Sequence, residues 1–341
     1  MGKTIQSSEY CTVGHPDRTC DYIASYLLDR YIEKDPLSRV ALEVQLKDQH
    51  CTISGEVTSK ADIGEEDVAA FAREAVNKIG YTADYQARYG KGNVVCGDEL
   101  EVTTHISRQS GDIAQGVNRD SWGDQGIFWG MAVDEPETGY MPRDYFLARK
   151  LGQEIAGKLG GLDVKTLVTL EDGKPVECFI AIPLAPGEDD APVVEAAKAL
   201  LGNDCSIVVN GTGRYVTHGS VGDCGTTGRK LVVDFYGGNS RIGGGSPWGK
   251  DPTKADVTLN IYARMCALEG MKRYGLPEMR CAISCCIGRR EVRVSLFDRD
   301  MKLVEERTES EPASHVIESL GLDKPMYAEM CGNGLFGYER L

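Results

Sequence analysis

The sequence predicts an α+β protein with three structurally similar subdomains, each a mainly antiparallel sheet covered by helices. Three observations support this prediction. A hairpin of two short strands followed by a helix occurs three times along the chain. The first strand of the first copy, residues 40–46, alternates apolar and polar residues, which is typical of a sheet with one buried face. The chain has 341 residues, enough for several small cores.

Each element follows from a local pattern. Residues 21–34 place their apolar side chains on one helical stripe, which predicts the first helix. Asp172-Gly173 in the second copy is a strong hairpin signal, because both turn residues need a positive φ. Long helices are also expected over residues 143–159 and 254–274. The three copies of strand, strand and helix are predicted over residues 40–46, 51–57 and 65–78; 165–170, 178–183 and 192–201; and 281–287, 292–297 and 314–320.

We divide the predicted subdomains approximately into residues 1–120, 121–240 and 241–341, and expect some interleaving in sequence. No low-complexity linker separates these segments, so the units are expected to pack tightly. The repeat lies in the pattern of elements and not in shared letters. One large α+β domain with coincidental spacing therefore remains an alternative.

Composition excludes several classes of protein. The 38 Lys and Arg residues are outnumbered by 52 Asp and Glu, and the resulting net charge of −14 disfavours nucleic acid as a partner. No apolar run approaches the roughly 20 residues that span a bilayer, so no membrane partner is expected. The 12 cysteines are scattered without a Cys-x-x-Cys motif, and the first residues lack the apolar core of a signal peptide. These features predict reduced thiols in the cytoplasm, and the spacing of the histidines predicts no zinc site.

Glycine is concentrated in residues 210–256, which hold twelve of the 40 glycines and are predicted to be loop rather than core. The segment carries six cations and four carboxylates, so it is net positive within an acidic protein. Glycine amides can approach phosphate oxygens closely while Lys and Arg neutralise their charge, which indicates polyphosphate binding. A solvated flexible loop with scattered charges is the alternative.

Part of this segment, residues 244–250, matches the first seven positions of a Walker A loop. Asp251, however, stands where Ser or Thr would hold Mg²⁺, and Pro247 removes an amide from the phosphate cradle. A P-loop fold also needs a parallel sheet, which the hairpins argue against. We therefore interpret the match as coincidental.

The continuation of this stretch to Asp256 is more informative. Pro252 suits the first turn of a helix, so Lys250 and Lys254 are expected on one side of a helix N-terminus, a site that favours anions. Asp256 is either a salt-bridge partner of these lysines or a ligand for a cation bound with phosphates. Near the N-terminus, Asp17 directly precedes the first predicted helix, where it would cap the helix or bind a hard cation.

Taken in order along nearly the whole chain, these pieces resemble the S-adenosylmethionine synthetase family. The stretches that carry the resemblance are Gly14-His15-Pro16-Asp17, Gly55-Glu56, Arg108-Gln109-Ser110-Gly111-Asp112-Ile113, Gly123-Asp124-Gln125-Gly126, Gly222-Asp223-Cys224-Gly225-Thr226-Thr227-Gly228-Arg229-Lys230 and Lys250-Asp251-Pro252-Thr253-Lys254-Ala255-Asp256. The resemblance implies three related α+β subdomains and a homodimer or dimer of dimers, with active sites between subunits.

The resemblance also implies a methionine adenosyltransferase. In this reaction the sulfur of L-methionine attacks C5′ of ATP, and the leaving triphosphate is cleaved to phosphate and pyrophosphate, with Mg²⁺ (two per site) and K⁺ assisting. His15 would orient or polarise the leaving oxygen, since thioether attack releases no proton. The implied residues are His15, Lys165, Arg229, Lys230 and Lys250 for catalysis and ATP binding; Asp124, Arg214 and Tyr215 for ATP; Glu56, Gln109, Asp223 and Lys254 for methionine; Asp17 and Asp256 for Mg²⁺; and Glu43 for K⁺.

Several positions depart from the family pattern. Arg18 stands where the family usually has Lys, and Trp248 where a small hydroxyl residue is typical. Val13 and Val257 replace an acidic residue and an Arg, and the stretch between Gln109 and the Asp124 turn is several residues shorter than usual. These departures indicate a divergent member. A phosphotransferase built on the Walker-like loop and a non-catalytic nucleotide-binding relative remain as alternative functions.

Overall fold

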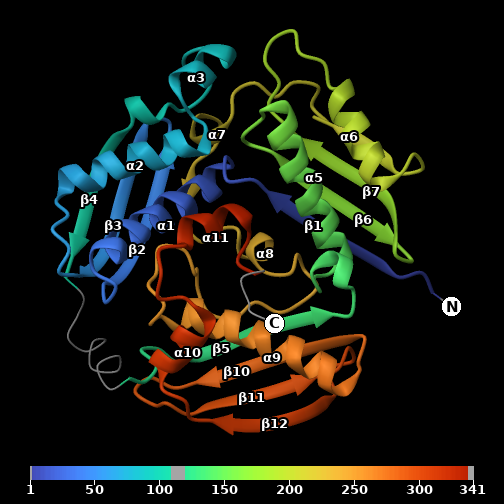
Figure 1. Cartoon of the computed structure of the whole chain (residues 1–341). Helices are drawn as coiled ribbons and strands as arrows, with labels where there is room; N and C mark the ends of the chain where they lie inside the picture. Colours follow the sequence, from blue (N-terminus) through green and yellow to red (C-terminus); the bar gives the residue numbers. More distant parts are fainter. Residues whose placement is uncertain (1, 109–119, 337–341) are drawn as a thin grey trace.

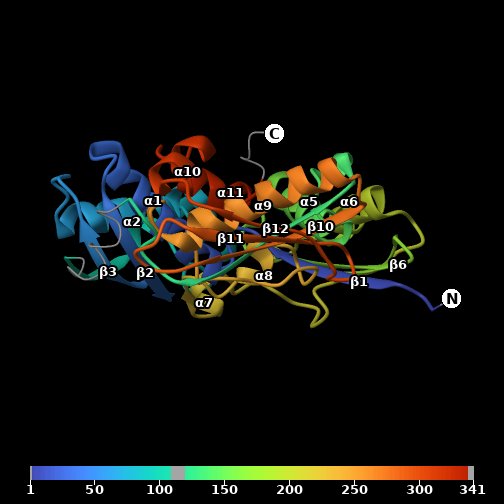
Figure 2. The ribbon, with the colours of Figure 1, turned by 90° about the horizontal axis from the view of Figure 1, so that it is seen from below.

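Three four-stranded sheets form the framework of the computed structural model, which describes residues 2–108 and 120–336 (Figure 1). Viewed from the side, most helices lie on one side of the molecule and the strands on the other (Figure 2). Each sheet therefore has one face covered by helices, as alternating strands require. The predicted α+β class is confirmed.

The first sheet has the strand order β4-β3-β2-β9. Its strands are β2 (Arg39–Lys47), β3 (His50–Thr58), β4 (Glu101–Ser107) and β9 (Gly225–Thr226), and the helices of this region are α1 (Pro16–Lys34), α2 (Glu65–Ile79), α3 (Ala83–Tyr89) and the 3-10 turn Gly97–Glu99. The apolar residues of β2 are buried and Glu43 between them is exposed, so the predicted alternation is confirmed. The helix predicted over residues 21–34 begins earlier, at Pro16, because His15 caps it.

The second sheet has the order β1-β6-β7-β8. Its strands are β1 (Ile5–Cys11), β6 (Lys165–Glu171), β7 (Lys174–Ala181) and β8 (Ser206–Val209), and its helices are α5 (Arg143–Leu159) and α6 (Ala191–Leu201). The turn between β6 and β7 is the predicted one, since Asp172 has φ 48° and Gly173 has φ 77°. A separate smaller apolar core lies between this sheet and its helices.

The third sheet has the order β12-β11-β10-β5. Its strands are β5 (Gly126–Val133), β10 (Glu278–Cys285), β11 (Val292–Phe297) and β12 (Leu303–Glu309); the C-terminal helices are α9 (Ala255–Tyr274), α10 (Ala313–Leu320) and α11 (Tyr327–Asn333), and a 3-10 turn covers Pro136–Thr138. The sequence analysis did not predict strands at β5 and β12. The main apolar core runs continuously from the first sheet to this one.

The sheets draw their strands from distant parts of the chain. β1 pairs with β6, so that Cys11 lies opposite Lys165, and β5 pairs with β10. The second sheet thus takes strands from residues 1–120 and 121–240, and the third sheet takes strands from residues 121–240 and 241–341. The division into these three segments stays a prediction, whereas the interleaving of the sheets is observed.

The glycine-rich residues 210–256 run between the three sheets and contain the short helices α7 (Gly219–Gly222) and α8 (Leu231–Asp234). The prediction that this segment is loop and not core is wrong in part, because Phe235, Tyr236 and Trp248 are each at most 1% exposed. Apolar anchors fix the segment while its glycines leave the backbone free to approach neighbouring strands. In the part of the chain that the structure describes, we find no helix with the length and apolar character needed to cross a membrane.

Candidate active site

Two long helices that pack against different sheets, α1 and α9, begin with the same arrangement of charges. The N-cap of α1 is His15 and its second residue is Asp17, whereas the N-cap of α9 is Lys254 and its second residue is Asp256. Each aspartate accepts a backbone N–H from the glycine-rich segment and pairs with a lysine of that segment. Helix N-termini carry partial positive charge and free amides, so both ends are suited to anions.

At the start of α1, the buried Asp17 organises the cations around it. Its Oδ1 accepts the Thr226 N–H at 2.9 Å and lies 3.5 Å from Arg229 Nε, while its Oδ2 pairs with Lys230 Nζ. The Asp17 N–H donates to His15 Nδ1 at 3.2 Å. The alternative in which Asp17 caps α1 is therefore wrong, because His15 is the capping residue.

His15 is neutral at pH 7 in this environment. Burial, reinforced by the charge of Lys230, lowers the pKa of His15 to about 4. Because Nδ1 accepts a hydrogen bond, the proton of the neutral ring belongs on Nε2. His15 thus has an N–H to donate and no readily available positive charge.

The cations near Asp17 also line a common hollow of about 310 Å³, which contains Lys165, Arg229 and Lys230. Glu9 of β1 lies in the same hollow and pairs with Lys165 at 2.8 Å. Sequence analysis missed Glu9, since no local pattern links β1 to β6. Three of the predicted catalytic residues are thus brought together in one place.

A second carboxylate missed by sequence analysis is that of Asp163, which is buried. Its Oδ2 accepts the Tyr215 hydroxyl at 2.6 Å and a backbone N–H at 2.9 Å, and burial raises the pKa of Asp163 to about 6. Tyr215 is therefore fixed by its hydroxyl. Asp223 is exposed, and its negative charge raises the pKa of His15, whereas Arg214 is exposed at the surface.

At the start of α9, Lys250 Nζ lies 2.5 Å from Asp256 Oδ2, and Asp256 Oδ1 accepts the Gly245 N–H at 2.7 Å. Lys250 also lines a hollow of about 270 Å³ together with Glu43 and Glu56. The structure therefore brings together residues predicted for catalysis, for K⁺ binding and for methionine binding. Their placement depends on the pairing of β2 with β3, which puts both glutamates beside the glycine-rich loop.

Lys254 is held by a different carboxylate. Its Nζ lies 3.5 Å from Oδ2 of Asp251, which is fully buried and accepts a backbone N–H of β2 at 2.8 Å. The prediction that Pro252 lies in the first helical turn is wrong. The Asp251 carboxylate holds this stretch as a turn, and α9 begins only at Ala255.

Asp124 lies exposed in the turn before β5, on the side of the molecule where α9 begins. Its carbonyl oxygen accepts a bond from Cys285 Sγ at 3.4 Å. The pKa of Cys285 is raised to about 12, mainly by burial, and the Asp256 charge adds to this shift. Gln109 lies outside the described residues.

Two polar sites result, and we name them by their helices. The α1 site consists of His15, Asp17, Lys165, Arg229 and Lys230, and the α9 site of Glu43, Glu56, Lys250 and Asp256. Their hollows have no lining residue in common among the residues that the structure describes. Within residues 2–108 and 120–336, no group of three or more His, Cys, Asp or Glu could hold a metal ion.

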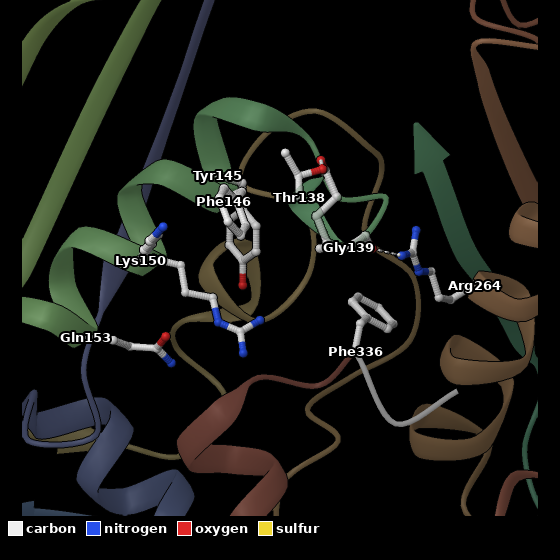
Figure 3. Close-up of a pocket in the computed structure, with 10 residues that line it drawn as sticks. Thr138, Gly139, Tyr145, Phe146, Lys150, Gln153, Arg264 and Phe336 are labelled. Carbon is white, nitrogen blue, oxygen red and sulfur yellow. Dashed lines mark hydrogen bonds between the residues drawn. The ribbon is translucent and has the colours of Figure 1, made fainter. Parts of the chain in front are cut away.

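A third hollow, of about 290 Å³, opens between α5 and α9 (Figure 3). Its lining includes Tyr145, Arg264 and Phe336, and no residue predicted for the site. Arg264 donates to backbone carbonyls of residues 131, 139 and 140, which indicates a structural role. Tyr145 donates its hydroxyl to the Val233 carbonyl of α8 at 2.7 Å. This hollow shares no lining residue with the hollows of the two polar sites among the residues that the structure describes.

These features define an α+β protein of three interleaved sheets with two anion-suited helix ends. Two family models match most of this chain. Residues 3–111 match the family model described as S-adenosylmethionine synthetase, N-terminal domain, and residues 217–341 match that of the C-terminal domain. The chain belongs to the S-adenosylmethionine synthetase family, and the resemblance and the enzyme class, methionine adenosyltransferase, are confirmed.

Individual relatives agree over almost the full length. The chain is 36% identical to the S-adenosylmethionine synthase of Desulforudis audaxviator, covering 99% of this chain and 94% of the relative. It is 34% identical to that of Nitratidesulfovibrio vulgaris, covering 99% and 93%. A solved structure described as an unusual S-adenosylmethionine synthetase from Campylobacter jejuni is similar with a TM-score of 0.87 at 27% identity, covering 98% of this chain and 94% of that chain.

Proposed function

We propose that this protein makes S-adenosylmethionine, phosphate and pyrophosphate from ATP, L-methionine and water. The methionine sulfur attacks C5′, the bond from C5′ to the triphosphate oxygen breaks, and the triphosphate is hydrolysed before release. One observation carries the proposal: two helix N-termini each present an aspartate paired to a lysine of one glycine-rich segment. Such paired charges suit a substrate that carries both phosphates and bound cations.

Of the parts of the substrates, the triphosphate of ATP needs the most positive charge around it. A leaving triphosphate carries about four negative charges, and positioned cations that meet this growing charge lower the barrier. Lys165, Arg229 and Lys230 would act from the α1 site and Lys250 from the α9 site. In the free protein Lys230 and Lys250 are engaged with aspartates, so we propose that they turn to phosphate oxygens when ATP binds.

Asp17 and Asp256 fit a magnesium role, because this ion is usually held by one or two carboxylates together with substrate phosphates. Each of them is a single carboxylate beside cations that favour phosphate, and neither has a full protein ligand set. Bound Mg²⁺ would neutralise triphosphate charge as it develops. Glu43, exposed in the α9 hollow, would lie near K⁺.

His15 would donate its Nε2 proton as a hydrogen bond to the leaving oxygen. Its low pKa supports this role, since the neutral ring keeps a defined donor at physiological pH. The ring would remain a hydrogen-bond donor throughout, because attack by a thioether requires no base.

The organic parts of the substrates would be bound by residues from both sites. Glu56, Gln109, Asp223 and Lys254 are proposed for methionine, and Asp124, Arg214 and Tyr215 for adenosine. Asp223 and Tyr215 lie near the α1 site, whereas Glu56 and Asp124 lie near the α9 site. We therefore propose a homodimer, or a dimer of dimers, in which the α1 site of one subunit is completed by the α9 site of its partner.

Mixing two inactive variants tests this shared site. Lys230→Met and Lys250→Met should each be inactive alone. Co-refolded or co-expressed, half of the dimers should be mixed and each should hold one intact site, so about a quarter of wild-type activity should return. A mixture that shows no activity above the separate variants, with mixed dimers demonstrated by mass spectrometry, would contradict a site shared between subunits.

Product analysis tests the reaction itself. Purified protein with ATP, L-methionine, Mg²⁺ and K⁺ should form S-adenosylmethionine, phosphate and pyrophosphate in equal amounts, and the assay should be repeated without K⁺. ADP as the nucleotide product would instead support a phosphotransferase, and nucleotide binding without turnover would support an inactive relative. We also propose a cytoplasmic location, which suits the twelve free cysteines, and no nucleic-acid or membrane partner.

A further inference from the structure

Arg18 is a buried cation that the proposed mechanism does not use. Its side chain is 3% exposed, and its Nη1 donates to Asp21 Oδ2 at 3.0 Å and to Asp234 Oδ1. Its Nη2 donates to the Cys331 carbonyl at 2.8 Å. These bonds join α1, α8 and α11 in the interior. Arg18 therefore holds elements together and does not line the hollow beside Asp17.

Trp248 completes the arrangement from the other end of the glycine-rich segment. The Arg18 guanidinium lies 5.1 Å from the centroid of the Trp248 ring, and Trp248 Nε1 donates to Asp234 Oδ2 at 2.9 Å. One carboxylate thus receives Arg18 on one oxygen and Trp248 on the other. The two departures from the family pattern noted in the sequence are in contact with each other and depend on the same aspartate.

This trio, defined as Arg18, Asp234 and Trp248, lies next to both polar sites. Every member is within four residues of a proposed site residue: Arg18 is next to Asp17, Asp234 is four residues after Lys230, and Trp248 is two residues before Lys250. A planar guanidinium can bond two acceptors and stack on an aromatic ring at once, which an ammonium cannot do. The trio is thus a rigid connection between the two sites of one subunit.

We propose that Arg18 is a positioning residue that sets the places of the triphosphate-binding lysines, acting through Asp234 and Trp248. This inference rests on the proposed function of those lysines. Without the guanidinium, the Asp234 carboxylate would be left without its main partner in a dry environment, and α8 and the Trp248 loop would shift to relieve it. Displacement of a catalytic group by about 1 Å is enough to cost on the order of 100-fold in rate.

The full-length Arg18→Lys variant tests the proposal, because it keeps the positive charge and removes the planar guanidinium with its forked N–H donors. We expect binding of inorganic tripolyphosphate with Mg²⁺, followed by calorimetry, to weaken about 10-fold, and kcat to fall by about 10- to 100-fold. The KM for methionine should change less than twofold. Arg30→Lys is the matched control: Arg30 lies on the same helix, pairs with Glu33 at 2.6 Å and stacks on Tyr26, far from the trio, and its replacement should leave both measurements unchanged.

Trp248→Phe provides a second, milder variant that keeps a ring and removes the bond to Asp234. It should weaken tripolyphosphate binding by about threefold, and its effect should be smaller in the Arg18→Lys background, since both act on one carboxylate. Folded Arg18→Lys protein with wild-type affinity for tripolyphosphate would overturn the inference. If Arg18→Lys does not fold, wild-type affinity in Trp248→Phe would overturn it. A wild-type protein that binds tripolyphosphate but makes no S-adenosylmethionine would refute the proposed function and leave the positioning test valid.

Discussion

Replacing Gly249 by alanine should damage stability and the α9 site together. Gly249 has φ +70°, and a Cβ at this position would lie 2.4 Å from the Leu42 carbonyl oxygen and 2.8 Å from Ala24 Cβ. The close approach lets the Leu42 N–H donate to the Gly249 carbonyl at 3.0 Å, which fixes the loop against β2 directly before Lys250. The left-handed backbone costs an alanine about 1 kcal/mol, and overpacking against backbone adds about 1–3 kcal/mol. We therefore expect a loss of about 2–4 kcal/mol in the free energy of unfolding.

Gly173→Ala separates the two contributions. Gly173 has φ +77° and nothing within 4 Å of the added Cβ, so its replacement should cost only the backbone contribution, about 1 kcal/mol. Urea unfolding of the variants at one protein concentration measures the difference, because subunit association also affects apparent stability. Gly249→Ala should in addition lower kcat/KM for ATP, and Gly173→Ala should not. Equal losses of stability in the two variants would refute the argument from steric contact.

Three further predictions concern pH, catalysis and metal. Burial lowers the pKa of His218 to about 4, so the unfolded chain takes up this proton first as the pH falls. Between pH 7 and pH 5 wild-type stability should therefore lose about 2 kcal/mol that His218→Gln does not lose, measured by denaturant titration at both pH values. Lys230→Met should lower kcat by about 100- to 1,000-fold in protein that is still folded at the assay temperature, with a lowered thermal midpoint because the buried Asp17 loses its partner. Lys158→Met, which removes an exposed ion pair, should keep kcat within about twofold of wild type; comparable rates in the two variants would remove Lys230 from the site. Chelation by EDTA should abolish product formation, and Asp17→Asn should raise the Mg²⁺ concentration for half-maximal activity by about 10-fold or more, a shift that calorimetric titration of Mg²⁺ with tripolyphosphate present should reproduce.

Local sequence patterns were sufficient to predict the strands and helices that bury one face. The alternation in residues 40–46 and the Asp172-Gly173 turn predicted two hairpins, and the helix expected over residues 143–159 has the same bounds as α5. The edge and crossing strands were not predictable in this way. β1 is paired with β6, and β5 with β10. Such partners are chosen by packing between distant segments, and a short window of sequence carries no information about that packing.

The same limit explains which site residues sequence analysis found. Asp17 and Asp256 were accessible to it, because each lies in a recognisable stretch at a helix N-terminus. Asp163 and Glu9 were missed, since their roles arise only where Tyr215 and Lys165 meet them across the fold.

Arg18 and Trp248 show this limit most clearly. Taken separately, each is a departure from the family pattern without an evident reason. Their contact with Asp234 gives an explanation, because a larger cation and a larger ring together occupy one interior space and satisfy both oxygens of one carboxylate. A single reversal, Arg18→Lys or Trp248→Ser, should therefore be more harmful than the two reversals combined, whereas two independent departures would have additive effects.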